Sequence, residues 1–533
     1  MTGLAHFRLS KMSILFILAI ILFWNPAIAV DTLVLRRGGA GDPESLDPHN
    51  FLNAFESTIL TDLFIGLTTT SAMDTPMPGS AESWTVSDDG LTYTFILREG
   101  LAWSDGVAID AYDFEWSFRH LMAPETASGS APYFYPVENG EAISRGQMPV
   151  ESLGVTALDD LTVEMRLEYP APYLMDIIAI NGKPLPRHRL EAHGSTWTRP
   201  GNMVTNGPFV LDDWVPGTYV KLIKNHNFYD AENVRLEEIY HIPSENMNTG
   251  FRRFRAGELD TLVFFPPEQL DWISKNMPEV LHLAPGLSVE LYLFNTEHPP
   301  FDDAQVRLAL SMAIDRETLV ERVMRTGEIP AYGYVPPTVS NYPVFAEADF
   351  ISVPYETRLE QARDLLAEAG FGPYNPLLVP LRYNTQDLQR RMAIAIAAMW
   401  KRIGVKAELL NTERKVLASD RKQGNFDVAR WLRVGATYDP TSFLIHFHSD
   451  LSGVNLSRYN DVVYNNLFEK AWYSRDIDDR AARMLEAEEH VLRDHPAIPL
   501  YFYTGRRLVQ TYVKGWIDNA RGVYPSRWLW IEE

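Results

Sequence analysis

The stretch AESWTVSDDGLTYTFILREGLAWSDGVAIDAYDF, residues 81–114, contains the clearest local fold signals of the chain. A polar turn at residues 87–90 precedes residues 91–97, where Leu91, Tyr93, Phe95 and Leu97 occupy every second position. This alternation is typical of a half-buried strand. A second turn follows at residues 103–106, and Asp110 then marks the start of a helix. The stretch predicts a β-hairpin that leads into a helix.

Other segments predict both helices and strands. Helical spacing of apolar residues occurs at 303–314, behind an acidic start, and again at 355–369 and 387–402. Gly370 and Gly404 are expected to end the last two helices in a left-handed conformation. Short strands are expected at 32–36, 376–383 and 405–410. The alternation favours a mixed α/β class, with a helix-covered sheet in the second half of the chain.

The first 29 residues have the pattern of a secretory signal peptide. A basic head with Arg8 and Lys11 is followed by an apolar run from Met12 to Trp24 and by small residues that end at Ala29. That run is about 13 residues long, whereas a membrane span needs about 20. Because the chain has no cysteine, the leader cannot end in a lipid-modified cysteine. We therefore expect a periplasmic protein that is not a lipoprotein.

Composition restricts the remaining function classes. The 533 residues exceed a single hydrophobic core, and zero cysteine excludes disulfides, thiolate nucleophiles and cysteine-bound metals. The whole chain carries a net charge of −22, and removal of the leader, with its two basic residues, makes it more negative. Such a surface favours solubility and disfavours nucleic acid or anionic lipid as a partner.

Motifs for catalysis and for metal binding are weak. The sequence contains no G-x-x-x-x-G-K-[ST], no G-x-S-x-G and no H-E-x-x-H. His446 and His448 would face the same side of a strand, but without a third ligand nearby a hydrogen-bonded pair is favoured over a metal site. We therefore expect no enzyme activity, no cofactor and no metal.

Six further phrases carry a resemblance that extends over nearly the whole chain after the leader. Together with residues 81–114, they are similar in wording and order to the oligopeptide-binding protein family, the extracellular solute-binding proteins of peptide-type ABC importers. The phrases are SLDPHN (45–50), PGNMVTNGPFVL (200–211), FRRFRAGELD (251–260), PPFDDAQVRLAL (299–310), PAYGYVPP (330–337) and DVARWLRVGATYDPTSFL (427–444).

The resemblance implies a two-lobed periplasmic binding protein fold with a hinge and an extra inserted small domain. Lobe I would be discontinuous and consist of residues 30–70, 186–290 and 501–533. The inserted domain would cover residues 71–185, and lobe II residues 291–500. Solutes would be captured in the cleft between the lobes and delivered to a membrane permease with cytoplasmic ATPase subunits. We expect a monomer.

The resemblance also suggests where the ligand binds, and several expected charges are missing there. Arg430 matches an arginine of the family that contacts the ligand carboxylate or organises the site; a structural salt bridge is the alternative. Ala436 stands where peptide binders have the aspartate that pairs with a free amine, and Arg433 stands at a tryptophan position. Apolar or neutral residues occupy other charged positions. The expected ligand-binding set is Arg430, Arg433, Leu432, Val434, Ala436, Gln389, Met324, Phe294, Leu52 and Ala54.

These departures leave the ligand open. One possibility is an oligopeptide or peptide-like solute whose ends are bound by main chain and water, or are blocked. The other is an acidic conjugate, resembling a sugar acid or an opine, held by Arg430 and Arg433 as bidentate partners. A secreted hydrolase with two buried carboxylates is a rival of another class. A signalling or chaperone role for the same fold is a third.

Overall fold

The described residues of this computed structural model run from 33 to 532, without residues 40, 52, 53, 245 and 452 and without the side chain of Ala54. The predicted signal peptide therefore lies outside them. Among these residues, no helix has both the length and the apolar character that a bilayer crossing requires. The names lobe I, inserted domain and lobe II are kept below for the residue ranges given above.

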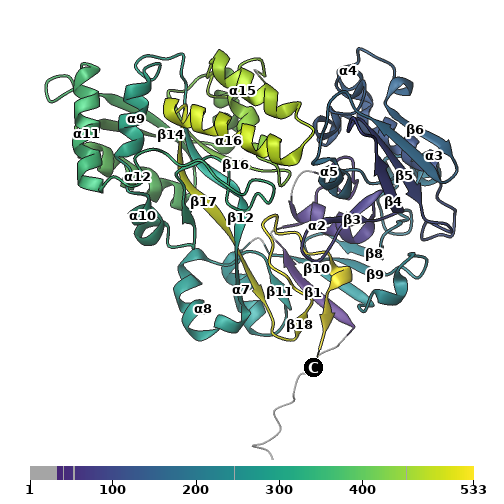
Figure 1. Ribbon diagram of the computed structural model, residues 1–533. Coiled ribbons are helices and arrows are strands. Elements are labelled where there is room, and N and C mark those ends of the chain that lie inside the picture. The colour runs from purple at the N-terminus through teal and green to yellow at the C-terminus, as the bar shows by residue number, and fades with distance from the viewer. Residues whose placement is uncertain (1–32, 40, 52–53, 245, 452, 533) are drawn as a thin grey trace, which may run out of the picture.

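One 11-stranded sheet passes through both lobes (Figure 1). The strand order is β15-β14-β16-β12-β17-β11-β1-β10-β9-β8, with β13 beside β17. In this order the bounds are Lys406–Thr412, Leu378–Asn384, Val428–Val434, Leu281–Phe294, Ala497–Val509, Thr261–Leu262, Val34–Gly39, Glu238–Pro243, Tyr219–Lys224 and Phe209–Val215, and β13 is Ile329–Pro330.

The two long strands β12 and β17 connect the lobes. They pair antiparallel along most of their length, with register shifts between Pro285 and Val289 and between Glu290 and Leu291. One end of β17 pairs with β11 of lobe I, whereas β12 pairs with β16 of lobe II. The predicted domain boundaries at 290/291 and 500/501 fall inside these two strands. A hinge motion would therefore bend or twist the shared sheet at the shifted register.

The inserted domain contains the predicted hairpin and helix. Strands β4 (Ala81–Val86) and β5 (Thr92–Leu97) pair antiparallel, and β7 (Thr162–Arg166) and β6 (Val155–Asp159) extend them to four strands. Helix α3 (Ala111–Met122) begins after Asp110, whose side chain accepts from the Tyr112 and Asp113 amides. The prediction for residues 81–114 is confirmed. The same region holds β3 (Pro76–Pro78), α4 (Gly140–Ser144) and α5 (Leu174–Asn181), and β3 pairs with β2 (Thr68–Thr70) at the end of the first lobe I segment.

Lobe II confirms the predicted helix-covered sheet. Parallel strands β14 and β15 are joined by α12 (Asp387–Lys401), and α9 (Ala304–Met312) is capped by Asp303. Helix α11 (Tyr355–Glu368) ends before Gly370, and both Gly370 (φ 86°) and Gly404 (φ 81°) are left-handed as expected. The other helices are α10 (Arg316–Thr318), α13 (Arg414–Gln423), α14 (Thr441–Leu444), α15 (Val462–Trp472) and α16 (Ile477–Asp494).

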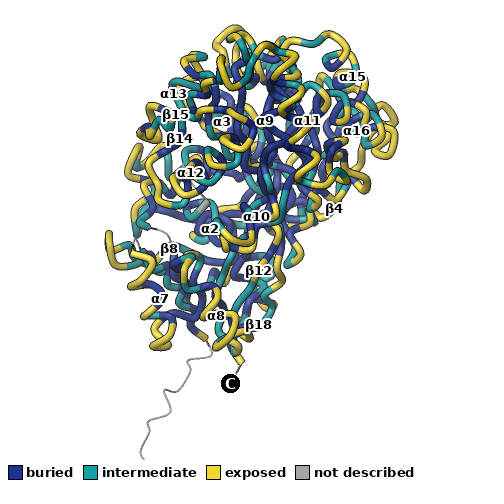
Figure 2. The backbone as a smooth tube through the Cα atoms, turned by 90° about the vertical axis from the view of Figure 1, so that its left-hand side faces the viewer, coloured by how far each residue is buried: buried dark blue, intermediate teal, exposed yellow. Residues whose placement is uncertain are grey.

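The hydrophobic cores show which parts behave as one body. A single buried cluster includes Leu35 of lobe I and Phe118 of the inserted domain, so these two parts pack together. Helix α2 (Ala54–Leu63) belongs to this cluster, and α6 (Arg187–His193) packs beside it. Lobe II has separate cores on the two faces of its sheet, and α7 (Met247–Arg255) and α8 (Leu270–Asn276) enclose a smaller one. In Figure 2 the buried segments, in dark blue, run through the interior and the exposed ones, in yellow, lie around them. Two units result, joined by β12 and β17.

Candidate ligand-binding cleft

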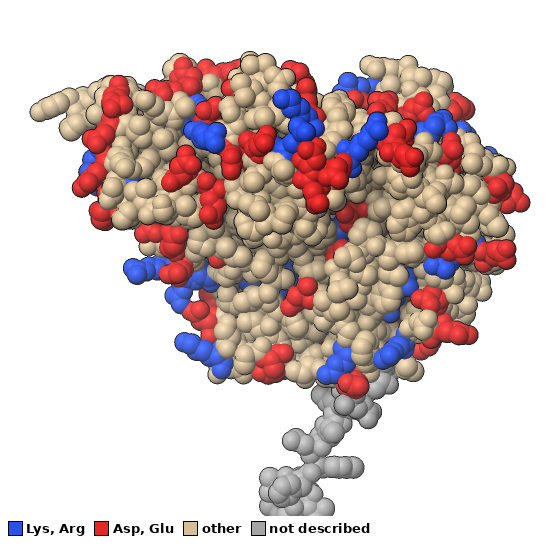
Figure 3. Space-filling view, in the orientation of Figure 1, with Lys and Arg blue, Asp and Glu red and all other residues tan. Residues whose placement is uncertain are grey.

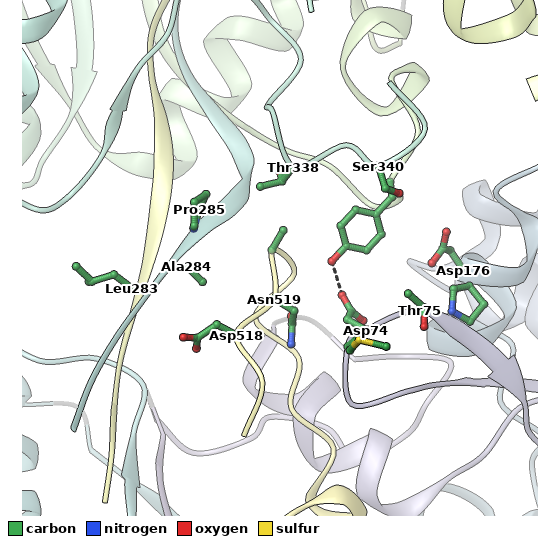
Figure 4. Close-up of a pocket in the computed structure, with 14 residues that line it drawn as sticks. Asp74, Thr75, Asp176, Leu283, Ala284, Pro285, Thr338, Ser340, Asp518 and Asn519 are labelled. Carbon is green, nitrogen blue, oxygen red and sulfur yellow. Dashed lines mark hydrogen bonds between the residues drawn. The ribbon is translucent and has the colours of Figure 1, made fainter. Parts of the chain in front are cut away.

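A cavity of about 400 Å³ lies where the two units meet (Figure 4). Its walls come from the inserted domain, from the lobe I half of β12, from lobe II and from the C-terminal loop. In the space-filling view, a furrow separates lobe II from the inserted domain on the face shown (Figure 3). The cavity is lined by residues 73–76, Asp176, residues 283–285, Thr338, Ser340, Tyr438 and residues 518–520.

Four charged or polar side chains join all three parts of the chain at this cavity. We call Asp74, Asp176, Tyr438 and Arg521 the Asp74 cluster. The Tyr438 hydroxyl of lobe II donates to Asp74 Oδ2 at 2.6 Å, and Arg521 Nε donates to the same oxygen at 2.9 Å. Arg521 Nη2 also donates to Asp176 Oδ1 at 2.9 Å, and its guanidinium lies 4.8 Å from the centre of the Tyr438 ring. The cluster ties lobe II to the inserted domain.

Burial makes the Asp74 cluster sensitive to loss of a partner. The Asp74 side chain is 0% exposed, and Oδ1 has no hydrogen-bond partner. Burial raises the pKa of Asp74, and the charge of Arg521 opposes this rise. Arg521 itself keeps a pKa above its usual value, because the two carboxylates outweigh the effect of burial. The arginine is therefore the group that permits two buried acids to remain close together.

Aromatic contacts also cross from the inserted domain to lobe II. The ring of Tyr169 lies 5.5 Å from that of Trp472 and 6.2 Å from that of Tyr473. The guanidinium of Arg480 lies 5.8 Å from the ring centre of Tyr173. Such contacts stabilise the arrangement in which the two units touch. Each contributes little free energy, so the two units can still separate.

Arg430 forms a salt bridge within the protein, as in the second of the two interpretations given for it above. Its Nε and Nη2 donate to Glu290 Oε1 and Oε2 at 2.5 and 2.6 Å. Glu290 is 1% exposed and lies on β12. In the antiparallel pairing with β16, Tyr292 is the residue opposite Arg430, and Glu290 is two residues before Tyr292. Burial raises the pKa of Glu290, and the charge of Arg430 opposes the rise. A bidentate buried pair of this kind organises the sheet and leaves Arg430 neutralised.

A second arginine lies beside this pair. Arg421 of α13 donates from Nη1 to the Arg430 carbonyl at 2.7 Å, and its Nε has no partner. Burial and the neighbouring charge of Arg430 lower the pKa of Arg421 to about 10. The group of Arg421, Arg430 and Glu290 thus keeps one net positive charge.

Arg433 lies on the opposite face of β16 from Arg430. Alternate residues of a strand point to opposite faces, so Trp431 shares a face with Arg433. On that face the ring of Trp431 packs against His446. Arg433 Nε donates to the Ser442 carbonyl at 2.6 Å, and Tyr133 of the inserted domain lies close enough to interact with its charge. Burial lowers the pKa of Arg433 to about 10. The two arginines therefore leave β16 on opposite faces, and their predicted role as anion anchors would have to be played at separate places.

Three further predicted positions lie in the core of lobe II. Phe294 is 0% exposed and stacks on Phe301 at 5.6 Å, Met324 is 2% exposed, and Gln389 is 4% exposed. Phe294 and Met324 belong to the apolar cluster on one sheet face. Their burial leaves them little accessible surface in this arrangement, and their role as ligand contacts stays a prediction.

The remaining predicted positions are less buried or lie outside the described residues. Leu432 and Ala436 are half-buried, and Val434 is 57% exposed. Leu52 and the side chain of Ala54 lie outside the described residues. Tyr438, two residues after Ala436, reaches the cavity and was missed, although it belongs to the quoted phrase at 427–444. Asp74, Arg521 and Glu290 were missed too, because no local pattern distinguishes them.

Each histidine of the pair contacts a partner through one ring nitrogen, while His446 Nε2 and His448 Nδ1 have no hydrogen-bond partner among the described residues. A short 3₁₀ turn, Ile445–Phe447, replaces the strand that would have aligned them. His446 Nδ1 lies 3.1 Å from the Val454 carbonyl, and His448 Nε2 lies 3.3 Å from Glu469. Burial, with the charge of Arg433, moves the pKa of His446 far below its usual value. The favoured interpretation, a hydrogen-bonded pair, describes these contacts.

Comparisons with known proteins agree with this architecture. The family model "Bacterial extracellular solute-binding proteins, family 5 Middle" matches residues 75–453. The chain is 35% identical over 523 residues to the periplasmic oligopeptide-binding protein OppA of Escherichia coli, covering 95% of this chain and 96% of that one. It is also 35% identical to YgiS of E. coli, named a probable deoxycholate-binding periplasmic protein, covering 94% of each.

A solved structure gives the same result in three dimensions. The E. coli murein tripeptide binding protein MppA superposes with a TM-score of 0.81 at 33% identity, covering 95% of this chain and 99% of that one. These proteins are named as binding proteins, and the superposition extends over both units joined by β12 and β17. The chain belongs to family 5 of the bacterial extracellular solute-binding proteins.

Proposed function

We propose that this protein is the periplasmic receptor of an ABC importer and that it captures oligopeptides or peptide-like solutes between its two units. The observation that carries this proposal is the 400 Å³ cavity between the units, spanned by the Tyr438–Asp74 hydrogen bond. Membership of a solute-binding family supports it, as do the relatives named for peptides. The leader pattern supports export, and a permease with ATPase subunits is the proposed partner.

The proposed mechanism is capture by closure, with no covalent step. Lobe II moves against the packed unit of lobe I and inserted domain by deformation of β12 and β17. A solute that contacts both units shifts the population toward the arrangement in which Tyr438 reaches Asp74. The closed face would then be the surface recognised by the permease.

The side chains suggest how the ends of a peptide would be treated. Ala436 cannot pair with a free amine, so the main chain of β16 and its neighbours would hold that end through amides and water. Arg430 is already paired with Glu290. The acidic-conjugate alternative loses its main support because Arg430 and Arg433 point to opposite faces. The relatives' names favour peptides.

Native mass spectrometry of the protein purified from the periplasm tests this function. We expect a heterogeneous set of short peptides to co-purify and to be released on denaturation. Calorimetry with tripeptides, and with deoxycholate because of the relative YgiS, then measures affinity, and small-angle scattering measures compaction. Binding of peptides with a decrease in radius of gyration supports the proposal. Failure of every extracted or supplied solute to bind and compact the protein refutes it.

A further inference from the structure

A second cavity, of about 390 Å³, lies within lobe I behind the C-terminal loop. It sits at the carboxyl ends of three neighbouring strands, β1, β10 and β11, which run parallel to one another. Open α/β sheets bind ligands in the crevice at this edge. The C-terminal loop lines both cavities, with residues 518–520 facing the cavity between the units and Trp516 and residues 521–524 facing the lobe I cavity. Arg521 lines the lobe I cavity and bonds Asp74 and Asp176 at the cavity between the units.

Several buried polar atoms in the wall of the lobe I cavity have no hydrogen-bond partner. They are Arg507 Nε, Arg521 Nη1, His241 Nδ1 and Asp42 Oδ1, whereas His241 Nε2 lies 3.4 Å from Oδ2 of the buried Asp62. His241 is 1% exposed and the Arg521 side chain is 8% exposed. Buried polar groups of native proteins are nearly always satisfied, so a concentration of unsatisfied ones in one cavity indicates a missing polar group. Most of these atoms are donors or can act as donors.

The arginines of the cavity differ in how they are neutralised. Arg37 donates to the Tyr524 carbonyl and to Ser526 Oγ and lies 3.7 Å from Asp62, and Arg521 is paired with Asp74 and Asp176. Arg507 forms no ion pair with a carboxylate of the described residues; its Nη1 donates to the Arg506 carbonyl. Asp518, a carboxylate whose charge acts on Arg507, pairs with His282 at 3.0 Å. Arg507 is therefore the charge that remains to be compensated.

Aromatic side chains and a helix end form the rest of the lobe I cavity, which has room for one residue of a solute. Trp516 and Tyr524 stack at 3.8 Å, and Phe55 and Phe264 also line the space. The first turn of α2 contributes to the wall, and the positive end of a helix favours an anion. Asp42 supplies an acceptor for an N–H group of the same solute. A carboxylate beside an amide matches this mixture of donors, one acceptor and aromatic surface.

We propose that the lobe I cavity is a subsite for a carboxylate-bearing residue of the captured solute, with Arg507 as the main partner of that carboxylate and Arg521 and His241 as further donors. The inference rests on the proposed function and adds a ligand preference to it. The protein binds peptides that bring a carboxylate to this cavity more tightly than neutral ones. The carboxylate comes either from an acidic side chain or from the C-terminus.

Calorimetry with three matched peptides distinguishes these sources. Replacing Ala-Glu-Ala by Ala-Gln-Ala removes the side-chain carboxylate, and replacing Ala-Gln-Ala by its C-terminal amide removes the other. We expect one of these two steps to weaken binding to the wild-type protein by about tenfold or more, as for loss of one partner of a desolvated charge pair. The same step should have little effect on Arg507→Gln. Arg252→Gln, an exposed arginine of lobe I, is the matched control and should behave as wild type.

Each result separates the two proposals. If neither step matters in the wild-type protein, or if the step is equally large in Arg507→Gln, the subsite is refuted while the receptor function stands. If none of these peptides binds, the subsite is refuted, and the receptor function is decided separately by the solutes that co-purify with the protein. Should Arg507→Gln not fold, Arg507→Lys keeps the charge without the bidentate fork. An intermediate step in that variant supports the proposal, and an unchanged step overturns it.

Discussion

Removal of the Tyr438 hydroxyl tests how the two units are held together. Tyr438→Phe keeps the ring under Arg521 and deletes only the bond to Asp74 Oδ2. A hydrogen bond to a charged group contributes about 1.5–3 kcal/mol, and the lower part of this range applies because Arg521 still donates to the same oxygen. A loss of about 1.5–2 kcal/mol shifts the equilibrium between contacting and separated units by about 10- to 30-fold.

Small-angle scattering and calorimetry measure that shift. The variant should have a larger radius of gyration without ligand, and its Kd for the solute identified by mass spectrometry should rise by a factor of about 10–30. Tyr374→Phe is the matched control, because Tyr374 is fully exposed in lobe II. Unchanged scattering and an unchanged Kd in Tyr438→Phe would refute the idea that the Asp74 cluster controls closure.

Three further predictions concern other side chains. Glu290→Gln leaves Arg430 and Arg421 buried without an acid, so the free energy of unfolding should fall by about 3–5 kcal/mol in denaturant titrations; a change below 1 kcal/mol, roughly the value for a surface pair, contradicts the buried pairing. Ala436→Asp should lower the Kd for peptides with a free amine and not for N-acetylated ones; equal effects on both contradict the alignment. Burial raises the pKa of Glu488 to about 7, so its contribution to stability declines as pH rises from about 4.5 through 7. Wild-type protein should therefore lose stability relative to Glu488→Gln between pH 5 and 8, and parallel curves contradict this.

Local signals predicted the elements well. Asp110 and Asp303 cap helices because their side chains reach amides two or three residues ahead, a relation contained in a few residues of sequence. Gly370 and Gly404 end helices for an equally local reason, the left-handed conformation that other residues avoid.

The site depended on partners that are far apart in the chain. Arg430 was recognised, but no local pattern pointed to Glu290 as its partner acid, which only the strand register brings within reach. Arg433 was assigned to the same role as Arg430, although an odd spacing along a strand sends the two side chains to opposite faces. The bond from Tyr438 to Asp74 joins residues 364 positions apart, which no sequence window contains.

The position of β17 in the middle of the shared sheet has a consequence for folding and export. β17 begins only at Ala497, yet it pairs with both β11 and β12, and Ser526 donates to Asp62 across 464 positions. Lobe I cannot complete its sheet until almost the whole chain is present. Contacts of such sequence separation make folding slow. A chain that passes through a membrane from its N-terminus would thus stay unfolded until its last segment has crossed, and a chain truncated before residue 497 would leave both lobes with open sheet edges.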